Sequence, residues 1–93
     1  MIVHDTPRDV TFRRFKRTAH MASDLPGAEG TAELLAFAKR IGLQERWIQN
    51  RGTPTEHFDL FDAAIGRAIK AGSVEIERRD FVRRVVQTKR GTP

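Results

Sequence analysis

The sequence predicts a single α/β or α+β domain, in which a small sheet of about four short strands carries three helices. Two observations lead to this prediction. Apolar residues recur at helical spacing in the central segments, and short β-prone or alternating segments lie between them. The stretches AFAKRIGLQERWI and AAIGRAIKAGSVEI also share one order, a helix followed by a glycine and a strand. Repeated units of this kind are typical of small mixed sheets with right-handed connections.

The N-terminal part is expected to supply two strands. MIVHDT begins with β-prone apolar residues and ends at the turn signal Asp-Thr-Pro. TAHMASD is predicted to form the second strand, and the breaker cluster DLPGAEG ends it. Between them, TPRDVTFRRFKR is polar and basic, which indicates a loop with weak strand character.

The most regular helical pattern begins at Thr31 and ends at Gly42. Thr31 or Gly30 can cap its start, and Gly42 is suited to the C-terminal cap. Its apolar positions are Leu34, Leu35, Ala38 and Ile41. RWIQN is then expected to be a short strand with Trp47 in the core, since tryptophan is more often buried than exposed.

Two further helices and one strand are expected in the C-terminal half. Asp59 or Asp62 can cap a helix that ends at Gly72, and this capping role is slightly favoured over a site for Asp59. SVEIE alternates between apolar and acidic residues and predicts a half-buried strand. Asp80 is expected to cap the last helix. This helix would turn Phe81, Val82, Val85 and Val86 inward and Arg83, Arg84, Lys89 and Arg90 outward.

The composition limits the class of protein. A chain of 93 residues makes one domain, and a hydrophobic fraction of 39% is that of a globular protein. The chain has no cysteine, which excludes disulfides and thiolate chemistry. No apolar run approaches the roughly 20 residues that span a bilayer, and the N-terminus lacks a signal-peptide pattern. We therefore expect a cytoplasmic protein without membrane association, and the sequence leaves its oligomeric state open.

The charge is concentrated in two segments of the chain. The net charge is +5, from 17 basic and 12 acidic residues. Residues 8–17 carry +4 and residues 78–90 carry +5, so the rest of the chain carries −4. We describe residues 1–17 and 78–93 as basic flanking segments and expect 91–93 to be disordered. Such a pattern favours a polyanionic or acidic partner, although a solubilising surface has the same composition.

Binding of a phosphate-bearing ligand, either a nucleic acid or a nucleotide, is the first functional prediction. The basic residues of the first segment are interleaved with phenylalanines, which offers both phosphate contacts and stacking surfaces. The predicted binding residues are Arg13, Arg14, Lys16, Arg17, Arg83 and Arg84. An interaction module that docks on an acidic protein, for instance a phage or mobile-element inhibitor, is an alternative that the sequence leaves open.

A small hydrolase or nuclease is the second candidate function. Each histidine has an aspartate nearby in the sequence: His4 with Asp5, His20 with Asp24, and His57 with Asp59. If His57 and Asp59 lie on a strand, they point to the same face and can share one proton or one ligand. The candidate catalytic residues are His57, Asp59, His20 and Asp24, and such a group could also hold a divalent metal. Because no dense ligand motif such as H-E-x-x-H is present, we predict no metal site and no cofactor.

The sequence resembles a bacterial and phage family of unknown function numbered four-zero-three-one. Three stretches carry the resemblance: AHMASD, LLAFAKRIGLQERWIQ and EHFDL…AIKAGSVEI. The resemblance covers roughly residues 2–76. It implies a polar set made of Asp5, His20, Asp24, Trp47, Gln49, His57 and Asp59. The chain departs from the family pattern at His4, which replaces an aspartate, at Phe58, which replaces a tyrosine, and at Ala64 and Ile65, which replace Lys-Arg. The family has no established activity, so the resemblance implies the position of a site and not its function.

Overall fold

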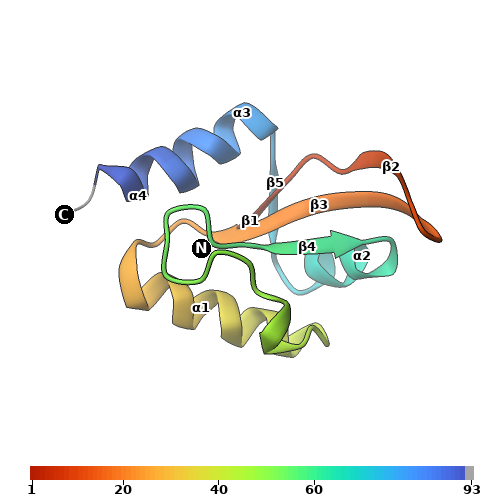
Figure 1. The fold of residues 1–93 in the computed structure, drawn as a ribbon, viewed down its shortest axis with the longest axis horizontal. Helices are drawn as coiled ribbons and strands as arrows, with labels where there is room; N and C mark the ends of the chain where they lie inside the picture. Colours follow the sequence, from red (N-terminus) through yellow and green to blue (C-terminus); the bar gives the residue numbers. More distant parts are fainter. Residues whose placement is uncertain (92–93) are drawn as a thin grey trace.

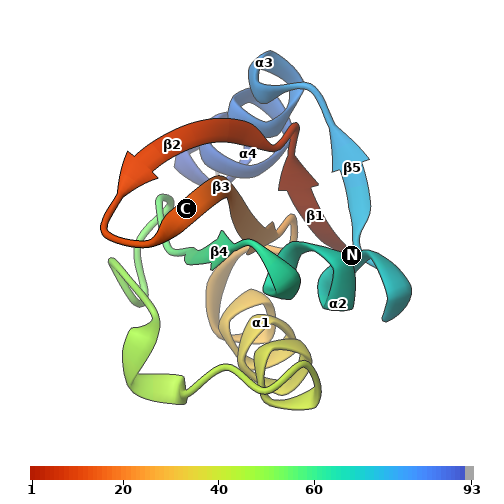
Figure 2. The ribbon, with the colours of Figure 1, turned by 90° about the vertical axis from the view of Figure 1, so that its right-hand side faces the viewer.

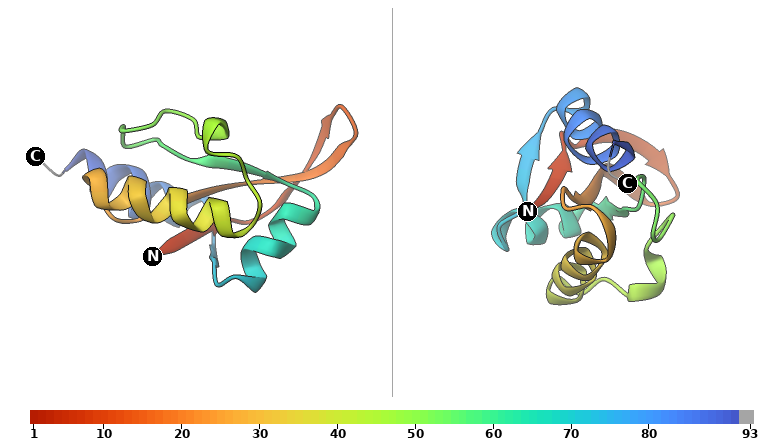
Figure 3. Two further views of the ribbon diagram at one scale, coloured as in Figure 1. Left: turned by 90° about the horizontal axis from the view of Figure 1, so that it is seen from below. Right: turned by 90° about the vertical axis from the view of Figure 1, so that its left-hand side faces the viewer.

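A computed structural model describes residues 1–91, and Figure 1 shows a curled mixed sheet between two layers of helices. This arrangement confirms the predicted fold class. Figures 2 and 3 show the same layers from other sides: α1 and α2 cover one face of the sheet, and the C-terminal helical segment covers the other. Of the segment expected to be disordered, residues 92–93 lie outside the described part of the chain.

Within residues 1–91 the sheet has five strands, and the long strand β3 is its centre. The strands are β1 (Ile2–Asp5), β2 (Arg8–Phe12), β3 (Phe15–Ser23), β4 (Phe58–Phe61) and β5 (Val74–Ile76). Met21 of β3 is paired with His4 of β1 and with Phe58 of β4, so β1 and β4 lie on opposite edges of β3. These pairs and the pair of β2 with β3 are antiparallel, whereas β5 is parallel to β1.

Three helical segments pack on this sheet. They are α1 (Gly27–Arg40), α2 (Ala63–Lys70) and a continuous C-terminal segment made of α3 (Arg78–Phe81), the π-helical η2 (Val82–Gln87) and α4 (Thr88–Arg90). A short 3₁₀ helix, η1 (Glu45–Trp47), lies in the long connection from α1 to β4.

The two faces of the sheet carry two separate groups of buried apolar side chains, because successive strand residues point to opposite faces. The larger group lies between the sheet and helices α1 and α2. It contains Met21, Leu34, Phe37, Ile41, Phe58, Leu60 and Ile65 among others. The smaller group consists of Val3, Ala22, Phe81 and Val85, and lies under the C-terminal segment.

The strand predictions were wrong in two places. The basic segment expected to be a loop forms β2 and the start of β3, joined by a turn in which Arg13 has a φ of 54°. Stacking of Phe12, Phe15 and Phe61 supports this hairpin, with Phe15 and Phe61 ring centroids 4.4 Å apart. RWIQN, expected to be a strand, is mostly the η1 turn, and only Gln49 forms a β-bridge, with His57.

The predicted N-terminal caps were also wrong as side-chain hydrogen bonds, whereas Gly42, with a φ of 85°, directly follows the C-cap residue Ile41 of α1 as predicted. Asp59 lies within β4, and Asp62, although it immediately precedes α2, makes no capping hydrogen bond. Its carboxylate accepts instead from the backbone N–H groups of Lys16 and Arg17. The first helix begins at Gly27 and the last at Arg78, so neither Thr31 nor Asp80 caps a helix.

For three side chains the predicted burial was wrong. Lys89, predicted to face outward, is 7% exposed, whereas Val82, predicted to face inward, is 38% exposed. Trp47, predicted to lie in the core, is 47% exposed. Trp47 lies in the loop that replaces the expected strand, so it is not part of the core between the sheet and the helices.

Alanine substitution of two helical glycines, one in α1 and one in α2, tests the packing at the start of α1. A Cβ atom on Gly30 would lie 1.9 Å from the carbonyl oxygen of Leu25, while a Cβ atom on Gly66 in α2 would meet nothing within 4 Å. We expect Gly30→Ala to lower the free energy of unfolding by about 1–3 kcal/mol, because the backbone must shift. Gly66→Ala is the matched control and should raise it by about 0.5–1 kcal/mol. Urea unfolding followed by circular dichroism measures both, and equal effects would contradict the packing described.

Candidate functional site

Four polar side chains lie on the sheet face that the C-terminal segment covers. The register of β3 and β4 pairs His20 with Asp59, and His57 precedes Asp59 by two residues. Asp5 is two residues from Val3, a member of the apolar group on this face. The sheet therefore brings together residues that are far apart in the sequence.

Asp5 holds His20 in one orientation. Its Oδ2 lies 2.8 Å from Nδ1 of His20, and its Oδ1 accepts the backbone N–H of the same residue at 2.7 Å. Burial alone would raise the pKa of Asp5, but the hydrogen bonds from His20 outweigh it and keep the pKa below its ordinary value. An ionised Asp5 only accepts, so Nδ1 of His20 carries the proton and Nε2 has a free lone pair when the ring is neutral.

His57 and Asp59 are held in a similar way. Nδ1 of His57 donates to the carbonyl oxygen of Thr55 at 2.8 Å, so its Nε2 faces Asp59, whose Oδ1 lies 3.4 Å away. The other oxygen of Asp59, Oδ2, accepts from the side-chain amide of Gln49. The contact between the two residues raises the pKa of His57 and lowers the pKa of Asp59.

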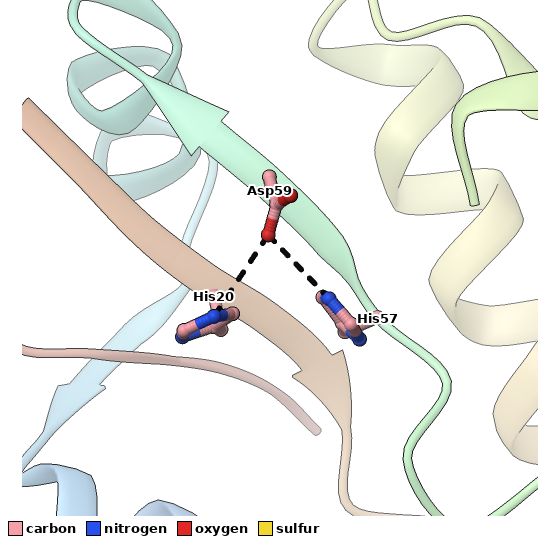
Figure 4. A group of neighbouring side chains, drawn as sticks. All are labelled: His20, His57 and Asp59. Atoms are coloured by element: carbon pink, nitrogen blue, oxygen red, sulfur yellow. Dashed lines mark ion pairs between the residues drawn. The ribbon is translucent and has the colours of Figure 1, made fainter. Parts of the chain in front are cut away.

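The result is a cluster of three half-buried groups that face one another, which we call the His–His–Asp cluster: His20, His57 and Asp59 (Figure 4). Oδ1 of Asp59 lies 3.9 Å from Nε2 of His20, and one ligand atom of each residue lies within 4.8 Å of the other two. The two rings meet edge to face, with centroids 5.3 Å apart. Three electron-donating atoms thus lie near one another, and a proton or a metal cation between them would offset their repulsion.

Two cavities adjoin the cluster. One, of about 200 Å³, lies under the C-terminal segment and is lined by His20 and His57 together with Arg78 and Phe81, among others. The other, of about 570 Å³, is lined by Asp59 and Gln49 and opens toward η1 and the β2–β3 hairpin. A molecule bound in either cavity lies beside the cluster.

The remaining predicted catalytic residue, Asp24, is engaged elsewhere. Its carboxylate binds the N-terminal ammonium group and the guanidinium of Arg84, both at 2.9 Å. His4 is fully buried and contacts the hydroxyl of Ser73 at 2.6 Å. The aspartates nearest in sequence are therefore not the partners of His4 and His20. His4 and Asp5 are adjacent on a strand and face opposite sides of the sheet, whereas Asp24 follows the end of β3 and is held by its two cations.

The six predicted binding residues fall into two groups. Arg13, Arg14, Lys16 and Arg17 lie at the β2–β3 hairpin, whereas Arg83 and Arg84 lie on the C-terminal segment. Figures 1 and 3 show the hairpin tip and the end of this segment at opposite ends of the long axis. Of these six residues, Arg13 lines the larger cavity and the other five do not.

Some residues around the cluster escaped the sequence reasoning. Arg78 lines the smaller cavity, although the sequence marks it only as one of the charges of the basic C-terminal segment. Thr55 contributes a backbone oxygen, which no side-chain pattern reveals. Asp5 and Gln49, by contrast, belong to the polar set that the family resemblance implies, and that resemblance is the signal that finds them.

The comparison with protein families confirms this resemblance. The model of the family described as "Protein of unknown function (DUF4031)" matches residues 3–88, and the chain belongs to this family. No curated protein matches the chain. No solved structure matches it either. None of the helices in residues 1–91 combines the length and the apolar content needed to cross a bilayer.

The hydrogen bonds of the cluster predict one tautomer for both histidines. In the metal-free protein at a pH where the rings are neutral, we expect the proton of His20 and of His57 on Nδ1 and a bare Nε2. Long-range ¹H–¹⁵N correlation spectra distinguish the two ring nitrogens. In Asp5→Asn, His20 loses this constraint and should populate both tautomers, while His57 should not change. An Nε2–H tautomer at both histidines of the wild type would contradict the geometry.

Proposed function

We propose that this member of DUF4031 is a small metal-dependent hydrolase of phosphate-bearing substrates, with the His–His–Asp cluster as its metal centre. The observation that carries the proposal is that three possible ligand atoms face one another, one from each residue of the cluster. The second polar atom of each side chain is already used in a hydrogen bond. Nδ1 of His20, Nδ1 of His57 and Oδ2 of Asp59 each have a hydrogen-bond partner, and the opposite atoms face one another. Metal ligands in proteins are oriented by second-layer hydrogen bonds of this kind.

The donor set suits a divalent transition metal. Two imidazoles and one carboxylate form the facial triad found at catalytic metal centres, and imidazole nitrogen favours Zn²⁺, Fe²⁺, Ni²⁺ or Cu²⁺ over Mg²⁺ and Ca²⁺. Three protein ligands leave coordination positions for water and substrate. The absence of a dense sequence motif is compatible with this assignment, since two of the ligands come from paired strands and meet through the sheet.

The distances fit the proposal after a small closure of the side chains. Ligands about 2.1 Å from a tetrahedral metal are about 3.4 Å from each other. Oδ1 of Asp59 lies 3.4 Å from Nε2 of His57 and 3.9 Å from Nε2 of His20. Rotation of the side chains about their outer bonds can bring the three ligand atoms to the metal without a change in the sheet.

The surrounding charge favours a phosphate ester as substrate. Arg78 lines the smaller cavity, and Arg13 and Arg67 line the larger one, so each approach to the cluster carries a cation. Guanidinium groups bind phosphate oxygens in two-pronged hydrogen bonds. A metal held by these three residues would supply Lewis-acid chemistry, polarising a phosphoryl oxygen and lowering the pKa of a coordinated water. Attack of that water on phosphorus would break the bond to the ester oxygen, which would leave as an alcohol after taking up a proton. The remaining basic residues, Arg14, Lys16, Arg17, Arg83 and Arg84, would add attraction for a longer polyanion.

Metal binding tests the centre directly. We expect the metal-free protein to bind one equivalent of Zn²⁺ in isothermal titration calorimetry. His57→Ala and Asp59→Asn should lose roughly 100-fold or more in affinity, because the first removes a ligand and the second removes the negative charge of a ligand. Asp5→Asn should lose about 10–100-fold through the orientation of His20. Asp24→Asn is the matched control, since its carboxylate lies outside the cluster, and should bind as the wild type. Equal affinity in His57→Ala and the wild type would refute the centre and leave a His57–Asp59 ion pair.

Hydrolysis of bis(p-nitrophenyl) phosphate separates the candidate functions. We expect turnover that depends on added Zn²⁺ or Mn²⁺, is lost with EDTA and falls at least 100-fold in His57→Ala. Arg83→Glu, on the exposed side of the C-terminal segment, should not affect turnover of this small ester. A binding protein without catalysis would give the reverse result, namely no turnover, and loss of oligonucleotide binding in Arg83→Glu but not in His57→Ala.

A further inference from the structure

The larger cavity has features that the proposed hydrolysis does not use. Its volume of about 570 Å³ is that of a site for a small organic ligand. The residues that line it come from the β2–β3 hairpin, from η1 and its flanks, from β4 and from α2: Arg13, Phe15, Leu43, Trp47, Gln49, Asp59, Phe61, Ala64 and Arg67. Three of these nine are aromatic, two are arginines, and Asp59 belongs to the His–His–Asp cluster.

We infer that this cavity holds a nucleobase stacked on aromatic side chains, so that the substrate is a nucleotide or a short single-stranded nucleic acid. That the nucleotide is hydrolysed rests on the proposed function, whereas binding of its base in the cavity does not depend on it. Phosphate esters without a base, such as sugar phosphates, have no use for the aromatic walls.

Trp47 is the first reason for this inference. It is 47% exposed although it is large and apolar. It lies in η1, and among the described residues no side chain from outside the α1–β4 connection is hydrogen-bonded to η1. Phe61 and Phe15 reach the same cavity from the sheet and stack on each other with centroids 4.4 Å apart and an angle of 21° between planes. Flat apolar surfaces on two elements suit a planar ring, since every nucleobase has a π face.

The two arginines are the second reason. Arg13 sits in the hairpin turn with a φ of 54°, and its guanidinium lies 5.4 Å from the ring centroid of Phe12. Arg67 is anchored from α2 by a hydrogen bond of 2.8 Å from its Nε to the carbonyl oxygen of Ile41. A cavity lined by both cations and aromatic rings matches a ligand that joins a planar ring to a phosphate, which is the chemistry of a nucleotide.

The third reason is that the cavity is continuous with the reactive groups. Gln49 and Asp59 both line it, and the amide of Gln49 is hydrogen-bonded to Asp59. A nucleotide whose base occupies the cavity therefore lies beside the proposed metal centre. An apolar side chain from a protein partner could fill the aromatic part alone, but would leave the arginines and Asp59 without counterparts.

The protein contains one tryptophan, so its intrinsic fluorescence reports on Trp47 alone. We would titrate the full chain in EDTA with adenosine monophosphate and with ribose 5-phosphate, exciting at about 295 nm, where the base absorbs little. We expect saturable quenching by the nucleotide and at least a 10-fold weaker effect of ribose 5-phosphate, which carries the same phosphate without a base.

Three variants sharpen the result, with calorimetry replacing fluorescence where Trp47 is changed. Trp47→Leu should weaken nucleotide binding between about 5- and 150-fold, the range that loss of one stacking contact gives. Arg13→Ala should weaken it about 10-fold, whereas Arg14→Ala, the next residue of the same turn but outside the cavity, should not. Unchanged affinity in Trp47→Leu, or equal binding of ribose 5-phosphate, would overturn the inference.

The test is independent of the metal centre, because EDTA is present throughout. If nucleotide binding is found but zinc is not bound, the pocket stands and the hydrolase proposal fails. If the chromogenic ester is hydrolysed but nucleotides do not quench, the hydrolase stands and the nucleobase inference fails. Binding of an unrelated acidic peptide at this face, abolished by Trp47→Leu while nucleotides stay unbound, would assign the cavity to a protein partner instead.

Discussion

The pairing of β3 with β4 is the constraint on which both the core and the candidate site depend. The register that sets His20 opposite Asp59 also sets Ala19 opposite Leu60 and Met21 opposite Phe58. Alternation then turns the apolar pairs toward α1 and α2, and the polar pair toward the C-terminal segment. A slip of one residue would exchange the two sets, so burial of the core fixes the geometry of the cluster.

The electrostatics of the cluster follow from its position on this face. A single small domain has little interior, and partly buried ionised groups remain there only when they are hydrogen-bonded and paired with opposite charge. Asp5 and Asp59 are partnered through His20, His57 and Gln49. Two carboxylates and two histidines can accept a divalent cation without creating an excess of positive charge. The arginines of the adjoining cavities then remain available for an anionic substrate.

The sequence predicts part of this site and none of its assembly. The spacing of His57 and Asp59 implies a common face on a strand, and the structure has that face, with Asp59 in β4 and His57 in the β-bridge just before it. Pairing of His20 with Asp24 fails because only strand register, a long-range property, selects Asp5 as the partner. The exposure of Trp47 was equally inaccessible, since burial statistics favour the core and nothing local indicates that its segment leaves the sheet. Helical period and glycine breaks, which are local, predict α1 correctly apart from its first turn, and they predict α2 with Asp62 as the residue that precedes it.

The central claim is that His20, His57 and Asp59 bind one metal ion together, and X-ray absorption spectroscopy of the zinc-loaded protein tests it most directly. The account predicts a first shell with two imidazole nitrogens at about 2.0–2.1 Å and oxygen ligands at about 2.0–2.2 Å, together with the multiple-scattering pattern of two histidine rings. His57→Ala should reduce that pattern to one ring. A zinc shell made only of oxygen, or an unchanged pattern in His57→Ala, would contradict the account.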